Sequence, residues 1–192
     1  MSRSTLKILP AFGDRYSPRS FQQRDVSDTE LELLLEAARW TPSSMNEQPW
    51  RFLVTRREGE GHAALFATLS AGNQRWAGAA PLLILCMAVR TFARNDHENF
   101  HARHDLGMAV AQLNAQATAL GMGMHILGGF NAVATRAAFE LPDELDLVSV
   151  LAIGFPGDPA QLPDDLRARE ENHSPRRPLQ EIARTGRWSG PV

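Results

Sequence analysis

The sequence has a single cysteine and no long hydrophobic run, and both absences limit what the protein can be. Because Cys86 is the only cysteine among 192 residues, no disulfide can form within the chain. Cys86 lies in the apolar segment Leu82–Val89, which predicts a buried and unreactive thiol. The longest apolar run, Ala77–Val89, is too short to cross a membrane and contains Pro81, and residues 1–10 lack the apolar core of a signal peptide. We therefore expect a soluble cytoplasmic protein that does not act at a membrane.

A strong charge of either sign is also missing. The formal net charge is −2 and the isoelectric point is about 6.3, which gives no basic surface for nucleic acid. Lys7 is the only lysine among twenty basic residues. An arginine within a motif is therefore weak evidence by itself that the motif recognises an anion.

The composition is that of a globular protein, with 43% hydrophobic and 22% charged residues. The length suits one domain that buries roughly 70% of its unfolded surface. Ser27-Asp28-Thr29-Glu30 forms a capping box, and apolar residues then follow at helical spacing as far as Ala38. Pro42 ends this predicted helix.

The remaining pattern predicts an α+β fold, with helices packed on a mostly antiparallel sheet. Residues 105–120 give the strongest helix, and its small residues on several faces suggest a central position, possibly against a second copy. After Pro156 the chain is rich in proline and charge, so residues 157–192 must wrap around something or stay loose. We expect strands at Arg51–Arg56, Pro81–Val89, Gly123–Leu127 and Asp146–Pro156, and further helices at His62–Ser70 and Ala132–Phe139.

The segment "WTPSSMNEQPWRF", Trp40 to Phe52, is unusual for a core element because it combines two tryptophans, two prolines and several small polar residues. The hydroxyl and carboxamide groups could recognise the donor and acceptor edge of a heterocycle. The alternative is a loop whose side chains cap a turn, with Trp50 in the core. The polar residues concerned are Ser43, Ser44, Asn46 and Gln48.

A second unusual segment is "DRYSPRSF", Asp14 to Phe21. Arg15, Ser17 and Arg19 alternate, and alternate residues of an extended segment point to the same side. Two guanidinium groups and a hydroxyl suit a phosphate monoester. The alternative is a solvated loop.

Three weaker signals lie further along the chain. Gly128-Gly129 at a strand end would let backbone N–H groups approach a ligand, or would only form a turn. Arg176 and Arg177 form a charge pair in the tail, which is usually solvated. The histidines at 97, 101 and 104 partly match helical zinc spacing but lack the usual catalytic carboxylate, so no metal site is predicted.

In this order, these segments resemble the nitroreductase family of flavin oxidoreductases. The resemblance covers nearly the whole chain and implies a nitroreductase-like fold and an intertwined homodimer that binds FMN at its interface. Residues 1–192 would be one domain, and residues 157–192 would be an extended arm that wraps the partner subunit. The matching segments are "RYSPRSF", "ARWTPSSMNEQPWRF", "GNQRWAGAAPLLIL", "DLGMAVAQLNAQATALGMGMHILGGF", "SVLAIGFP" and "RRPLQEI".

The resemblance also implies which residues would contact the flavin. One group holds the phosphate and ribityl chain, a loop is presented across the dimer, and a third group meets the ring, where a backbone N–H faces flavin N5. The phosphate and ribityl group consists of Arg15, Tyr16, Ser17, Arg19 and Arg176. The loop presented across the dimer consists of Pro42, Ser43, Ser44 and Asn46, braced by Gln48 and Trp50. The residues that meet the ring are Asn73, Leu127, Gly128 and Gly129. Two positions depart from the family pattern: Ser174 replaces a basic residue of many relatives, and Gly128 replaces a glutamate of some relatives.

The implied reaction is a ping-pong transfer from NADH or NADPH, through the flavin, to a small-molecule acceptor such as a nitroaromatic, a quinone or an enone. No side chain needs to act as an acid or base, because the flavin carries the chemistry. Two alternatives stay open. One is different flavin chemistry on the same fold, such as reductive dehalogenation or flavin cleavage, and the other is a flavin-binding protein without enzymatic activity.

Overall fold

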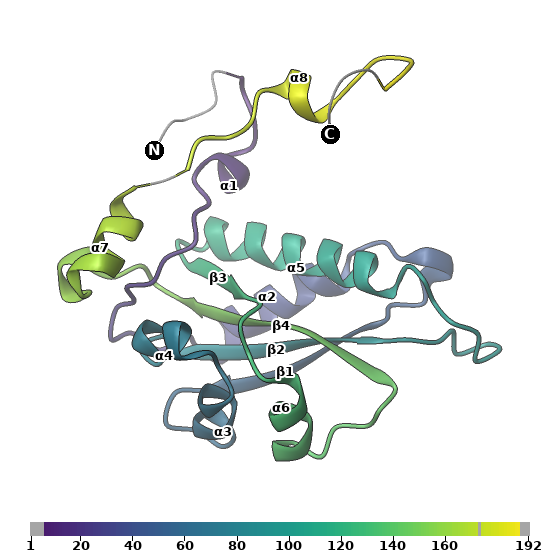
Figure 1. Cartoon of the computed structure of the whole chain (residues 1–192), viewed down its shortest axis with the longest axis horizontal. Helices are drawn as coiled ribbons and strands as arrows, with labels where there is room; N and C mark the ends of the chain where they lie inside the picture. Colours follow the sequence, from purple (N-terminus) through teal and green to yellow (C-terminus); the bar gives the residue numbers. More distant parts are fainter. Residues whose placement is uncertain (1–5, 173, 189–192) are drawn as a thin grey trace.

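The computed structural model describes residues 6–172 and 174–188. At its centre is an antiparallel four-stranded sheet in the order β1-β2-β4-β3 (Figure 1). The predicted α+β class with an antiparallel sheet is therefore confirmed. The strands are β1 (Trp50–Arg56), β2 (Leu82–Val89), β3 (Gly123–Leu127) and β4 (Leu145–Gly154).

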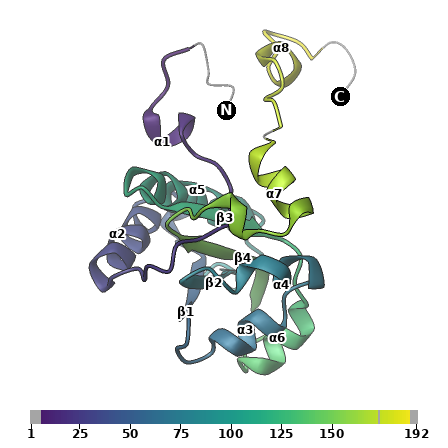
Figure 2. The same ribbon diagram turned by 90° about the vertical axis from the view of Figure 1, so that its left-hand side faces the viewer.

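Helices cover both faces of the sheet (Figures 1 and 2). The helices α2 (Asp28–Arg39) and α5 (Ala102–Ala119) lie on one face. The other face carries α3 (His62–Ala67), α4 (Ala71–Ala77) and α6 (Ala132–Ala138). The sheet therefore separates two hydrophobic cores.

Strand β2 contributes to both cores, which explains why it has no polar face. Ile84 and Cys86 point into the core under α5, whereas Leu83 and Leu85 point into the opposite core. Burial raises the pKa of the Cys86 thiol to about 12. The prediction of a buried and unreactive cysteine is confirmed.

The start of α2 agrees with its sequence signal. The Glu30 backbone N–H donates to Ser27 Oγ at 3.2 Å, and the Ser27 N–H donates to the Glu30 carboxylate at 2.8 Å. This reciprocal pair satisfies two of the unpaired donors at the helix N-terminus.

Helix α4 was not predicted, because its seven residues show little apolar periodicity and only Trp76 and Ala77 are buried. The other predicted helices and strands are present, with ends that differ by up to three residues. The short elements that complete the fold are α1 (Pro10–Gly13), η1 (Ser44–Asn46), η2 (Pro159–Gln161), α7 (Asp164–Glu171) and α8 (Leu179–Ile182).

The first part of the tail packs against its own chain. Leu166 of α7 is 3% exposed and belongs to the core beneath α4. Asp165 forms two hydrogen bonds of 2.7 Å with Arg75 of α4. Beyond α7 the chain leaves the sheet, and α8 projects on the side that carries α5. The N-terminal α1 lies on this same side, next to α5 (Figure 2). None of the described helices is long and apolar enough to cross a membrane.

Candidate functional site

All the residues predicted to hold a phosphate meet at one cavity of about 440 Å³. Two of them are in contact, because Arg15 Nη1 donates to Ser17 Oγ at 3.3 Å. The chain therefore brings together residues separated by some 160 positions in the sequence. The predicted members of the lining are Arg15, Tyr16, Ser17, Arg19 and Arg176.

Positive charge dominates this cavity. Arg169 joins the three predicted arginines, while Glu170 is the only carboxylate among the described residues of the lining. Burial, and then the positive charge of Arg176, lower the pKa of the Arg15 guanidinium. Holding like charges close together at a partly buried position costs free energy, and an anion in the cavity would relieve that cost.

Besides Arg169, the sequence analysis missed two titratable residues of this cavity. His125 projects from β3, and Glu170 projects from α7 and is 6% exposed. The position of His125, two residues after Gly123 and two before Leu127, could have indicated an inward-facing side chain. Glu170 gave no signal, because it is one of several charged residues in a short polar helix.

The paired glycines follow β3, three residues beyond His125 and thus about 10 Å further along the strand direction. Both are exposed, and within the described residues neither backbone N–H donates a hydrogen bond. A Cβ atom built on Gly128 meets nothing within 4 Å, whereas one on Gly129 lies 2.9 Å from Ser70 Oγ. Gly128 therefore faces open space, and Gly129 is tightly packed.

Asn73 supports this turn from α4. Its Nδ2 donates to the Gly129 carbonyl at 3.0 Å, and the Ser70 backbone N–H donates to the same oxygen at 2.9 Å. Leu127 is 2% exposed, so its side chain belongs to the core, and only its backbone could contact a ligand. Two hydrogen bonds therefore hold Gly129 to the start of α4.

The Pro42–Gln48 loop forms a second predicted group and is held in a strained conformation. Met45, Asn46 and Gln48 have φ values of 54°, 56° and 50°, a region that costs non-glycine residues about 1 kcal/mol or more each. The Gln48 N–H donates to Ser43 Oγ at 2.9 Å, and Gln48 Nε2 donates to the Asn46 carbonyl at 3.3 Å. Strain of this kind persists only where surrounding contacts enforce it.

The anchor of this loop is Asp105, a buried carboxylate in the first turn of α5. It accepts the Ser44 backbone N–H at 2.9 Å and is 2% exposed. Trp50, which follows the loop, is 7% exposed and lies in the core. This position agrees with the alternative interpretation of the segment as a loop with Trp50 in the core. In contrast, Trp40 and Met45 are 72% and 71% exposed. Asp105 therefore holds the base of the loop, while the apolar side chains of Met45 and the preceding Trp40 are exposed.

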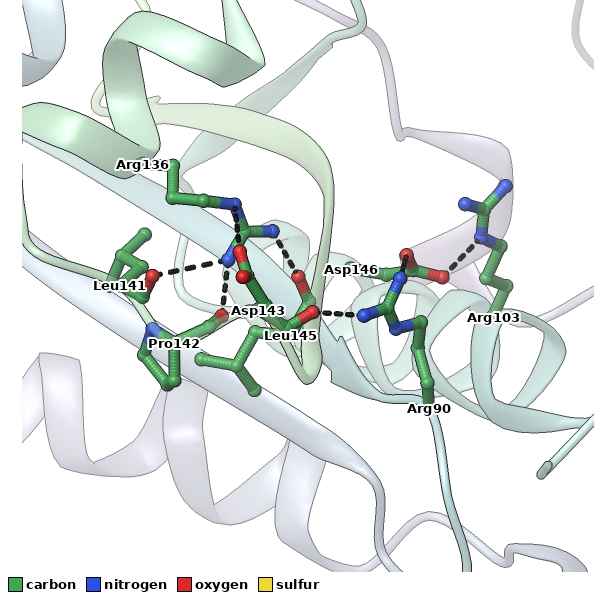
Figure 3. A network of polar contacts seen from close by, with 8 residues as sticks. All are labelled: Arg90, Arg103, Arg136, Leu141, Pro142, Asp143, Leu145 and Asp146. Atoms are coloured by element: carbon green, nitrogen blue, oxygen red, sulfur yellow. Dashed lines mark hydrogen bonds and ion pairs between the residues drawn. The ribbon is translucent and has the colours of Figure 1, made fainter. Parts of the chain in front are cut away.

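A polar network fixes the same end of α5 (Figure 3). Arg103 Nε donates to Asp146 Oδ2 at 2.8 Å, which ties the first turn of α5 to the start of β4. Arg90 Nη1 lies 3.9 Å from the other carboxylate oxygen of Asp146. Nearby, Arg136 closes the turn between α6 and β4 by donating to the carbonyl groups of Leu141, Pro142 and Leu145.

The cavity and the loop lie at opposite ends of α5. The loop is attached to Asp105 in the first turn, whereas the cavity is built against β3, which follows the last turn. An 18-residue helix is about 27 Å long. Within one copy of the chain, the loop and the cavity are therefore connected to opposite ends of this helix.

The histidines make separate local contacts. His97 Nδ1 lies 3.3 Å from the Asn95 amide, and His104 Nδ1 lies 3.1 Å from Asp105 Oδ1. Among residues 6–172 and 174–188, no group of three or more histidine, cysteine, aspartate or glutamate side chains is arranged to hold a metal ion.

Comparison with known proteins gives consistent matches. The model of the nitroreductase family matches residues 13–70 and 60–155. An uncharacterized 15.4 kDa protein of Mycolicibacterium smegmatis is 34% identical over 150 residues, which cover 74% of this chain and 99% of that protein. The FMN reductase (NAD(P)H) of Bacillus subtilis strain 168 is 26% identical over 184 residues, which cover 87% of this chain and 73% of that protein. A crystal structure described as an oxidoreductase containing FMN has 33% identity and a TM-score of 0.92, covering 98% of this chain and 96% of that one.

Proposed function

The chain belongs to the nitroreductase family, and from that premise we propose that it is an oxidoreductase that binds FMN and takes electrons from NADH or NADPH. The names of the similar proteins support FMN as the cofactor and NADH or NADPH as the electron donor, since one is an FMN reductase that uses NAD(P)H and another contains FMN. The observation that carries the proposal is the arginine-lined cavity beside β3.

The residues of this cavity fit the phosphate of FMN. Arg15, Arg19 and Arg176 supply charged donors, and Ser17 supplies a hydroxyl. Charge-assisted hydrogen bonds from guanidinium groups are among the strongest that a phosphate can accept. The lowered pKa of Arg15 supports the same assignment, because a phosphate would compensate the repulsion between Arg15 and Arg176.

The glycine turn fits the flavin ring. The backbone N–H groups of these two exposed glycines have no acceptor within the described residues, and the space beyond Gly128 is open. Donors fixed in this way can stabilise negative charge that develops on a ring without reorganising. Asn73 keeps the turn in place through the Gly129 carbonyl.

The Pro42–Gln48 loop would act on the flavin of a second copy. Its separation from the cavity by the length of α5 supports this arrangement, as do the exposed Trp40 and Met45. The exposed Leu179, Ile182 and Trp188 support a role for residues 174–188 as an arm against the partner. In the proposed homodimer, each flavin contacts the cavity of one subunit and the loop of the other.

When bound, FMN supplies the redox chemistry, because it accepts a hydride from NADH or NADPH and later reduces a small acceptor. We propose a ping-pong order, in which the nicotinamide leaves before a nitroaromatic, quinone or enone enters. The side chains of the site bind and orient the reactants, and none is required as an acid or base.

The proposed function is tested with the purified protein. We expect FMN to bind in a ratio of about one per chain and its yellow absorbance to bleach anaerobically on addition of NADH or NADPH. Bound FMN that neither nucleotide reduces would point to other flavin chemistry or to a flavin-binding protein. A protein that does not bind added FMN would contradict the proposal.

Replacing the arginines tests the phosphate site. Arg15→Ala should weaken FMN binding by about 1.5–3 kcal/mol, the range for a hydrogen bond to a charged group. Arg19→Ala should cost at least as much, because it also leaves Glu170 facing the phosphate without its partner. The measurement is a fluorescence titration of the apoprotein with FMN.

Arg167→Ala is the matched control for these variants. Arg167 lies on α7 beside the cavity residues, but it pairs with Asp164 at the surface. Its replacement should leave FMN affinity unchanged. Equal FMN affinities for wild type, Arg15→Ala and Arg19→Ala would mean that these arginines belong to a solvated loop and do not bind the phosphate.

A further inference from the structure

The cavity contains a carboxylate, Glu170, although it is expected to bind an anion, and the presence of this negative charge needs a physical explanation. Glu170 is 6% exposed and lines the same cavity as four arginines, with Arg19 Nη1 at 3.6 Å from its Oε2. A negative charge there repels a phosphate and weakens its binding. Glu170 must therefore contribute something that offsets this cost.

Its contribution is a contact with the backbone of the arginine loop. Both carboxylate oxygens of Glu170 accept the Arg19 backbone N–H, each at 3.0 Å. The Arg19 guanidinium is further away, with Nη1 at 3.6 Å from Oε2. The backbone contact is therefore the closer of the two.

The other side of the same peptide group is held by His125. The Pro18 carbonyl lies 3.0 Å from His125 Nδ1. Since a carbonyl can only accept, Nδ1 carries the proton and donates it. The Pro18–Arg19 peptide is thus held from both sides, through its C=O by a side chain of β3 and through its N–H by a side chain of α7.

Holding this peptide fixes the residues on either side of it. The proline ring sets φ of Pro18, and a residue before proline is restricted to extended ψ values. The two side-chain contacts restrict the dihedrals that flank the peptide, ψ of Pro18 and φ of Arg19. Pro18 also packs directly on Gly123, where a Cβ atom would lie 2.3 Å from Pro18 Cγ. These contacts therefore restrict the backbone from which the Ser17 and Arg19 side chains enter the cavity.

We propose that His125 and Glu170 are positioning residues that clamp the Pro18–Arg19 peptide and so preorganise the cradle for the cofactor phosphate. The inference rests on the proposed function, since the ligand is FMN. Preorganisation raises affinity because the loop loses less conformational entropy when the ligand binds. Neither residue needs to touch the phosphate to have this effect.

Two pairs of variants separate the clamp from simpler roles. His125→Asn keeps an N–H donor, because the asparagine Nδ2 is as many bonds from the backbone as histidine Nδ1. His125→Phe loses the donor but keeps an aromatic ring next to Trp76. In the wild type, the centroids of the His125 and Trp76 rings are 4.6 Å apart. Glu170→Gln keeps an acceptor for the Arg19 N–H, whereas Glu170→Leu removes it. Both Glu170 variants remove the negative charge.

The experiment measures the dissociation constant of FMN for each apoprotein by quenching of flavin fluorescence. We expect His125→Phe and Glu170→Leu to bind about tenfold more weakly than wild type, as the loss of such hydrogen bonds implies. His125→Asn should stay within about threefold of wild type, a range below that loss. Glu170→Gln should bind as well as wild type or more tightly. The two pairs are independent, so if one variant fails to fold, the other pair decides.

Specific results would overturn the clamp. Tighter binding by Glu170→Leu would mean that the carboxylate only competes with the phosphate. Weak binding by His125→Asn together with normal binding by His125→Phe would mean that the ring matters only for packing on Trp76. Equal affinity in wild type and all four variants would also exclude the clamp while leaving the proposed function intact. A wild-type protein that does not bind FMN would instead contradict the proposed function itself.

Discussion

Glutamate in place of Ala111 is expected to separate the two copies and release the flavin at the same time. Ala111 is exposed in the middle of the outer face of α5, together with Gly107 and Ala119. In the proposed homodimer this small-residue face meets the partner, as the composition of the helix predicted. An unpaired carboxylate buried at such a contact costs about 3–5 kcal/mol. The flavin would be lost too, because its site would lack the partner's Pro42–Gln48 loop.

Light scattering after gel filtration, combined with the FMN content per chain, measures this effect. The variant should elute as a monomer of 21.2 kDa with little bound FMN, whereas the wild type should elute as a dimer. Ala137→Glu is the control, because it makes the same change at an exposed position of α6, on the opposite face of the sheet. If the Ala111→Glu variant is a dimer with full FMN content, this face of α5 is not part of the dimer interface. A monomeric wild type with tightly bound FMN would exclude the dimer.

The parts of the fold that sequence predicted best are those whose local pattern allows one burial geometry. Strand β2 has eight apolar residues in succession, a run of strand length that a strand covered on both faces buries completely. The start of α2 depends on contacts within four consecutive residues, which the sequence displays directly. In contrast, α4 is fixed by Trp76 packing under the sheet, so it depends on tertiary contacts that no short window contains.

The residues of the candidate site also divide into those that the local sequence predicts and those that only tertiary contacts identify. Arg15, Ser17 and Arg19 were predicted because their alternation is local, and they do line one cavity. Glu170 was not predicted, because it meets Arg19 across 151 positions of the sequence. The Pro42–Gln48 loop was recognised by its composition, but its attachment to Asp105 requires the fold. Local spacing therefore indicates which groups could bind a ligand, while the residues that position those groups come from distant elements.

Valine in place of Gly128 is expected to slow flavin reduction by on the order of a hundredfold, the cost of displacing reactants from near-attack spacing. The fold should tolerate this change. A Cβ atom at Gly128 meets no atom within 4 Å, and the φ of Gly128 lies outside the left-handed region that disfavours other residues. The new side chain would instead fill the open space where the backbone N–H groups are proposed to meet the flavin ring. FMN affinity should fall much less, because the arginine cavity is unchanged.

Gly129 provides the comparison that identifies the cause. A Cβ atom there would lie 2.9 Å from Ser70 Oγ and 3.1 Å from Asn73 Nδ2. Gly129→Ala must therefore push against the protein's own turn and should lower the melting temperature, an effect that Gly128→Val should not share. Stopped-flow bleaching of FMN by NADH or NADPH measures the reduction rate, and thermal unfolding of the apoproteins measures stability. If Gly128→Val is reduced within about threefold of the wild-type rate, far short of the penalty for displacement, the two glycines form only a turn, and the proposed contact with the ring is wrong.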